Sequence, residues 1–120
     1  MQSLMTLVKY FDLFNVPEEI PYKVFEVELQ KEMFDSGFID LNWDETFKKY
    51  KIEPDKTIEN LFTQNIIASA NLELLGAMVT YVFRGCTHWW DCSLFEYRDF
   101  FIQSFARLKE LVEEDIGVSK

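Results

Sequence analysis

The hydrophobic residues of this chain recur three or four positions apart over most of its length. Because that spacing places side chains on one face of an α-helix, the pattern predicts a series of amphipathic helices. A first helix is expected to end near Asn15, before Pro17. A second is expected over residues 21–37, because proline is favoured in a first helical turn and glycine just after a last one. The apolar stripes are Leu4, Leu7, Val8, Phe11 and Phe14 in the first helix, and Tyr22, Phe25, Leu29 and Met33 in the second.

Capping signals mark the starts of three later helices. Asn42 followed by Glu45 has the spacing of a capping box, and so has Ser93 followed by Glu96. Asn71 can cap a further helix, which is expected to stop at residue 85, a glycine. The apolar positions are Trp43, Phe47 and Tyr50 after Asn42; Leu75, Met78, Val79 and Val82 after Asn71; and Leu94, Tyr97, Phe101, Phe105, Leu108 and Val112, up to about Glu114, after Ser93.

One more helical stripe follows the break at Pro54 and consists of Ile58, Leu61, Phe62 and Ile66. With only 4 Gly and 3 Pro in 120 residues, the chain lacks the turn signals of a β-sandwich, although residues 78–83 could also suit a strand. The expected fold class is all-α: a compact single-domain bundle of about five helices with a long C-terminal helix. Residues 1–115 form the domain in this interpretation, and residues 116–120 form a frayed end.

Charge narrows the possible partners. The chain has 12 Lys and Arg against 21 Asp and Glu, a formal net charge of -9. Nucleic acids and anionic membranes would repel such a protein, whereas a basic protein surface would attract it. Acidic residues gather on the second predicted helix, at Glu26, Glu28, Glu32 and Asp35, and could occupy a cationic groove of a partner. The alternative is a solvated face that serves solubility and is relieved by nearby lysines.

Residues 86–92, Cys-Thr-His-Trp-Trp-Asp-Cys, hold both cysteines, the only histidine and two of the three tryptophans. A zinc site would need a second pair of ligands, which the sequence lacks. A disulfide within the loop and a cysteine nucleophile with His88 as base are further alternatives, but no third group is identified to orient that base. We therefore predict no catalytic residue, no metal and no cofactor, and interpret the run as a contact loop.

Trp89 and Trp90 cannot easily bury in one core, because adjacent side chains point in different directions in both helix and strand. We expect one to be interior and the other to be an exposed anchor for a partner. The alternative is a loop tryptophan folded back onto Phe95 or Tyr97. Arg84, His88 and Asp91 complete the predicted contact loop, and Arg84 could pair with Asp91 or stack on a ring.

Three stretches carry a resemblance to a known family. They are residues 35–39, Asp-Ser-Gly-Phe-Ile, followed by Trp43; residues 72–75, Leu-Glu-Leu-Leu, followed by Thr80 and Arg84; and residues 106–111, Ala-Arg-Leu-Lys-Glu-Leu. Over about residues 22–111 the chain resembles a family of small uncharacterised bacterial, archaeal and phage proteins, a domain of unknown function. After the position of Arg84 that family usually brings a second arginine, a phenylalanine and a glycine that opens the next helix, and residues 85–92 have neither the second arginine nor that glycine. The resemblance implies a small helical domain and transfers no activity or site residue.

Together these features predict a small acidic, non-enzymatic protein-binding module that occupies a basic surface. The specific hypothesis is a phage or mobile-element inhibitor of a host nucleic-acid-handling system, such as a CRISPR effector. The alternatives are a housekeeping domain that forms a homodimer through its Trp89-Trp90 edge and, third, a cysteine-dependent enzyme. The N-terminal residues lack signal-peptide features, and residues 61–83 are too polar to span a membrane, so a cytoplasmic location is expected.

Overall fold

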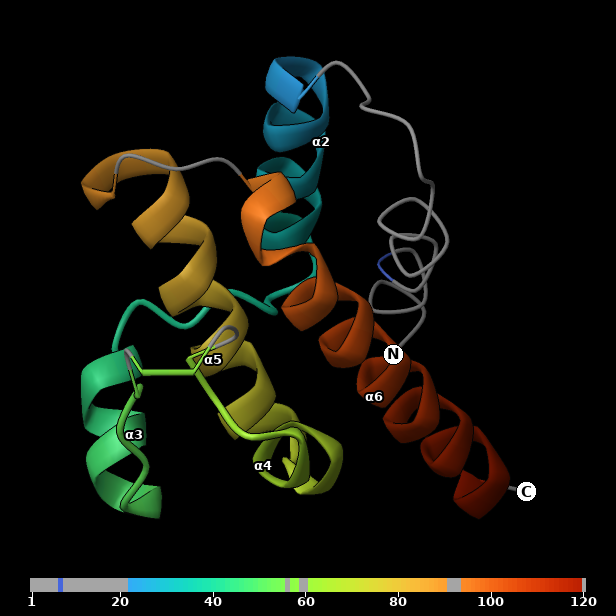
Figure 1. Ribbon diagram of the computed structural model, residues 1–120. Coiled ribbons are helices and arrows are strands. Elements are labelled where there is room, and N and C mark those ends of the chain that lie inside the picture. The colour runs from blue at the N-terminus through green and yellow to red at the C-terminus, as the bar shows by residue number, and fades with distance from the viewer. Residues whose placement is uncertain (1–6, 8–21, 56, 59–60, 91–93, 120) are drawn as a thin grey trace.

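The computed structural model describes residues 7, 22–55, 57–58, 61–90 and 94–119 (Figure 1). These residues form helices and connecting loops, and they include no strand, which confirms the predicted all-α class and its long C-terminal helix. Residues 78–83, which could also have suited a strand, are helical. The elements are α2 (Tyr22–Asp35), α3 (Trp43–Tyr50), α4 (Gln64–Ser69), α5 (Leu72–Arg84), the π-helical turn η1 (Gly85–Trp89), the 3₁₀ turn η2 (Leu94–Tyr97) and α6 (Arg98–Ser119).

Helix α5 is the centre of the fold. It packs against α3 on one side and against α6 on the other, while α4 packs against α6 (Figure 1). Seven consecutive residues of α5, from Leu74 to Thr80, are buried, so this helix is enclosed around its circumference. A helix that is apolar on all sides is expected in such a position, because every face meets another element.

Aromatic rings fill much of the core. Phe47 of α3 meets Phe62 with ring centroids 5.7 Å apart, and Phe62 meets Phe100 of α6 at 5.8 Å. Phe100 and Phe101 are themselves in edge contact at 5.2 Å, and both are fully buried. Such tilted and edge-to-face pairs are the favoured geometries of aromatic side chains. They connect α3 to α6 across the segment that precedes α4.

The predicted apolar stripes of α2 and α6 are confirmed wherever their side chains are described. Leu29 and Met33 of α2 are fully buried, and Leu7, in helical backbone, is buried as well. The buried residues of α6 include four predicted ones, namely Phe101, Phe105, Leu108 and Val112. Helix α6 begins at Arg98, after the η2 turn, and extends to Ser119, beyond the expected end near Glu114. Ser93, its predicted cap, lies outside the described residues, as does most of the first predicted helix.

The cap at Asn71 is confirmed, whereas the capping box at Asn42 is wrong. The Asn71 side chain accepts a hydrogen bond from the backbone N–H of Leu74 at 2.9 Å and so begins α5. Asn42 does precede α3, but its side chain makes no capping bond. Its backbone N–H instead donates to the carboxylate of Asp40 at 2.9 Å, which is an Asx-turn. The local turn therefore directs the chain into α3 in place of the predicted cap.

The helix predicted after Pro54 is wrong for its first half. Leu61 has a left-handed backbone with φ 67°, which no α-helix tolerates, and α4 begins only after Thr63. The backbone N–H of Asp55 donates to the carbonyl oxygen of Leu61 at 2.7 Å and closes a loop. Leu61 and Phe62 are nonetheless buried. The apolar spacing therefore predicted correctly that Leu61 and Phe62 are buried, but it predicted a helix where the chain forms a loop.

Helix α5 ends at Arg84, as predicted, but Gly85 does not break the helical path. Its backbone is right-handed, with φ -56° and ψ -51°, and the chain continues through η1 to Trp89. The predicted stop required a left-handed glycine, which occurs here at Gly37, with φ 74°, after α2. Among the described residues, no helix is both long and apolar enough to cross a membrane.

Candidate functional site

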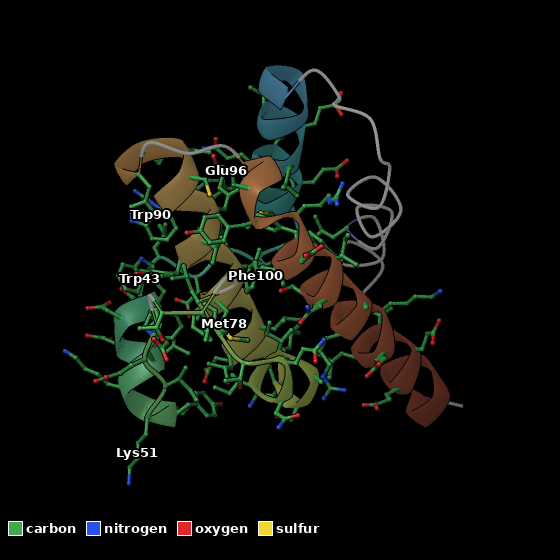
Figure 2. The ribbon with its side chains drawn as sticks, viewed as in Figure 1. Trp43, Lys51, Met78, Trp90, Glu96 and Phe100 are labelled. Carbon is green, nitrogen blue, oxygen red and sulfur yellow. The ribbon has the colours of Figure 1, made fainter. Side chains whose placement is uncertain are left out.

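The predicted contact loop begins with the π-helical turn η1, which continues α5 as a wider helical turn. Trp90 follows this turn, and its half-buried ring lies 5.4 Å from Tyr81 and 5.7 Å from Tyr97, measured between ring centroids. The ring of Trp43 also contacts Tyr81, with ring centroids 4.8 Å apart. The two labelled tryptophans thus lie on one side of the molecule, bridged by Tyr81 (Figure 2).

This packing gives Trp90 a structural role, because its ring holds the end of η1 against α5 and η2. The contact with Tyr97 is the one expected from the alternative interpretation, a loop tryptophan folded back onto Phe95 or Tyr97. The side chain of Trp89 lies outside the described residues, and so do Asp91 and Cys92. The prediction of an aromatic anchor therefore stays a prediction.

The described side chains of the loop differ in how far they are buried. Cys86 is buried, with 7% exposure, while His88 is exposed. Arg84 is half-buried near the end of α5. No group of three or more His, Cys, Asp or Glu residues that could hold a metal gathers among the described residues.

The predicted acidic face of α2 is only partly solvent-exposed where its side chains are described. Glu28 and Asp35 are exposed and Glu32 is half-buried, and together with Lys31 they line a shallow hollow. Their i, i+4, i+7 spacing places the three acids on one stripe of the helix. The side chain of Glu26 lies outside the described residues.

Next to this acidic stripe, α2 carries an apolar stripe that the sequence reading did not identify. Val27 is 68% exposed and Phe34 is 48% exposed, and their spacing of seven residues places them on the same face. Leu41, in the loop after α2, is 57% exposed. Scattered exposed hydrophobic residues are common, whereas two on one helical face form a stripe that a partner could cover.

A second feature that the sequence reading missed is a cleft of about 910 Å³ between the α2–α3 loop (residues 36–42), α3 and α5. We call it the α3–α5 cleft. Asp40 organises it: one carboxylate oxygen accepts from the backbone N–H of Asn42, and the other accepts from the hydroxyl of Thr46 at 2.7 Å. The backbone N–H of Asp40 donates to the hydroxyl of buried Thr80 at 2.9 Å. These bonds fix the loop between α3 and α5.

An ion pair crosses one side of the cleft. The ammonium of Lys49 lies 2.8 Å from a carboxylate oxygen of Glu73, and both side chains are solvent-exposed. The hydrogen bond to Glu73 raises the pKa of Lys49, and the same bond lowers the pKa of Glu73. The pair is too exposed to contribute much stability, so its main effect is to position the two side chains.

A sequence signal for this cleft existed but was weak. Asp40 lies two residues before Asn42 and six before Thr46, which allows a carboxylate to satisfy both a turn and a hydroxyl of the following helix. Thr80 lies forty residues away in sequence, so its bond to Asp40 depends on the tertiary fold. Local spacing alone could not have placed these three residues together.

A scan against protein-family models, a search of curated proteins and a search of solved structures each found no match to this chain. The family resemblance therefore rests on the three sequence stretches that carry it. The two surfaces that bear on function are the paired acidic and apolar stripes of α2 and the α3–α5 cleft.

Proposed function

We propose that this protein is a non-enzymatic protein-binding module, and that α2 is the element that docks onto a basic partner. The observation that carries the proposal is the pair of adjacent stripes on α2. Val27 and Phe34 offer exposed apolar area, and Glu28 and Asp35 offer negative charge beside it. A partner with basic residues around an apolar patch complements both stripes.

The two stripes have different roles in this proposal. The net charge of -9 and the carboxylates of α2 attract a cationic partner and accelerate its approach. Burial of Phe34 and Val27 then supplies the affinity, because desolvated aromatic and aliphatic side chains dominate interface energies. A basic groove that normally holds a nucleic acid is one surface of this kind. The inhibitor of a nucleic-acid-handling enzyme, of phage or mobile-element origin, is the narrower form of the proposal.

The test measures binding to defined cationic probes. Isothermal titration calorimetry would use a helical peptide of leucines and lysines, and purified nucleic-acid-binding enzymes, including a CRISPR effector nuclease, at low and at physiological salt. Phe34→Ser should weaken binding at both salt concentrations. The double variant E28Q/D35N should weaken it mainly at low salt, since salt screens exposed charges.

The matched control is the double variant E113Q/E114Q, which removes the same charge from exposed positions on α6. If binding weakens equally in both double variants, net charge alone would explain the effect, and a docking role for α2 would be contradicted. For the narrower form, the wild-type protein should block cleavage by the effector nuclease, and Phe34→Ser should relieve that block. Sedimentation of the protein alone would separate these results from self-association.

A further inference from the structure

The α3–α5 cleft has the dimensions and walls of a ligand site. Its volume of about 910 Å³ falls within the range of small-molecule and side-chain pockets. Ile39 and Leu72 contribute apolar lining. Gly76 allows the loop to lie directly against α5, because a Cβ at that position would be only 2.7 Å from the carbonyl oxygen of Phe38. The cleft is therefore formed by a fixed loop on a rigid helix.

The charges around the cleft are unequal. Three carboxylates line it, from Asp40, Glu45 and Glu73, against the single ammonium of Lys49. Lys49 is already paired with Glu73. Among the described residues, no cation forms a salt bridge with Asp40 or Glu45. The cleft thus keeps two carboxylates that no described cation neutralises, next to an apolar wall.

The carboxylate of Asp40 is held in a fixed orientation. Each of its oxygens already accepts one hydrogen bond, from the N–H of Asn42 and from the hydroxyl of Thr46. A carboxylate oxygen can accept more than one hydrogen bond, so both retain capacity for a further donor. Glu45 is exposed on α3 and adds a second carboxylate to the same lining. Fixed and movable carboxylates together suit a ligand with several N–H donors.

We propose that the α3–α5 cleft binds an organic cation, a guanidinium or ammonium group carried on a short apolar stem. The cationic head lies between Asp40 and Glu45, where charge-assisted hydrogen bonds form, and the stem lies along Ile39 and Leu72. The cation has two possible sources, an arginine or lysine side chain of a partner protein or a free small amine. The first source rests on the proposed function, whereas the cation chemistry itself does not.

The experiment compares three probes by calorimetry: agmatine, a short peptide with one central arginine, and the same peptide with citrulline in its place. Citrulline keeps the shape of arginine but loses its charge, so the cation proposal expects roughly ten-fold weaker binding of the citrulline peptide. If agmatine binds as well as the arginine peptide, a free amine is a sufficient ligand. If the arginine peptide binds clearly better than agmatine, the source of the cation is a protein side chain.

Two variants locate the site. Glu45→Gln should weaken binding of the arginine peptide by roughly two- to five-fold, the range expected for loss of one exposed carboxylate. Glu53→Gln, an exposed carboxylate outside the cleft, is the matched control and should leave binding unchanged. In NMR titrations, the methyl groups of Ile39 and Leu72 and the amide of Gly76 should shift with the arginine peptide. Equal binding of the arginine and citrulline peptides, or equal effects of the two variants, would overturn the proposal.

The outcome is independent of the α2 docking surface. The E28Q/D35N variant should bind the arginine peptide as the wild type does, even though it weakens binding of a whole basic partner. A protein that binds the arginine peptide in the cleft but binds no basic protein would contradict the proposed function and leave the cation site standing. The reverse pattern would contradict the cation site alone.

Discussion

Gly85, the first residue of η1, and Trp90, which follows its last, pack against each other. The backbone N–H of Trp90 donates to the carbonyl oxygen of Gly85 at 2.6 Å, and the indole ring folds back over the glycine. A Cβ on Gly85 would collide with three atoms of that ring. The absence of a side chain at residue 85 is thus required by packing, because its helical backbone suits any residue.

Gly85→Ala should destabilise the protein. The higher helix propensity of alanine stabilises the fold by about 1 kcal/mol relative to glycine. Displacement of the packed indole destabilises it by about 1–3 kcal/mol, so we expect the clash to outweigh the gain in propensity. Urea denaturation followed by circular dichroism would measure the free energy of unfolding. In a Trp90→Ala background the same change should be neutral or stabilising, since the ring is gone. A destabilisation that persists in that background would contradict the packing explanation.

Thr80→Val should loosen the loop that carries Asp40. Valine has nearly the shape of threonine but no hydroxyl, so the backbone N–H of Asp40 loses the acceptor that it contacts at 2.9 Å. An unsatisfied, partly buried donor costs about 1–3 kcal/mol. Unfolding in urea would give the loss, and faster hydrogen exchange at the Asp40 amide would localise it. Thr80→Ser keeps the hydroxyl and is the control; equal exchange rates in the two variants would argue against this bond.

The sequence was most informative where a signal acts over a few residues or where a long stripe repeats. The cap at Asn71 and the buried positions Phe101 and Phe105 are such cases, because helix spacing and capping are local properties. It failed at Leu61, because apolar spacing reports burial, and a loop with left-handed backbone can bury side chains as well as a helix can. At Gly85 the prediction gave the end of α5 correctly but the reason for the glycine incorrectly, because contact with the ring of Trp90 explains why residue 85 has no side chain.

The surfaces were harder to predict than the helices. The acidic stripe of α2 could be read from its spacing, since Glu28 and Asp35 are seven residues apart on a helix. The exposure of Phe34 could not be predicted in this way, because a hydrophobic residue in an amphipathic pattern is ordinarily assigned to the core. The α3–α5 cleft needed tertiary structure, since Asp40 and Thr80 meet only when the loop is laid on α5.

The ion pair of Lys49 and Glu73 should give a small stability contribution with two pH limits. The pKa of Glu73 is lowered from its ordinary 4.5, so the contribution is present above that value and is lost as pH falls through the folded-state pKa. The pKa of Lys49 is raised from 10.5, so the contribution is present below that value and is lost as pH rises through the folded-state pKa. The difference in unfolding free energy between wild type and Glu73→Gln should therefore be largest at neutral pH and decrease at both extremes. High salt should also reduce this difference, and a salt-independent difference would contradict an electrostatic origin.

Tyr81 should make the folded protein lose stability at alkaline pH. Its ring is packed against Trp43 at 4.8 Å and Trp90 at 5.4 Å, and burial raises the pKa of its hydroxyl above the ordinary 10.0. The contribution is fully present below the unfolded-state pKa, where both states are protonated. As pH rises past 10.0, the unfolded state ionises first and the free energy of unfolding falls, until pH passes the folded-state pKa.

Tyr81→Phe isolates this effect, because it keeps the ring and removes only the titrating hydroxyl. Urea denaturation of both proteins at several alkaline pH values should show a steeper loss of stability in the wild type than in Tyr81→Phe. An ultraviolet titration of the folded wild type should show a component that ionises later than in the urea-unfolded chain, and this late component should be missing in the variant. Parallel stability curves for the two proteins would mean that the Tyr81 hydroxyl ionises as readily in the fold as in water, and that the packing against Trp43 and Trp90 does not shield it.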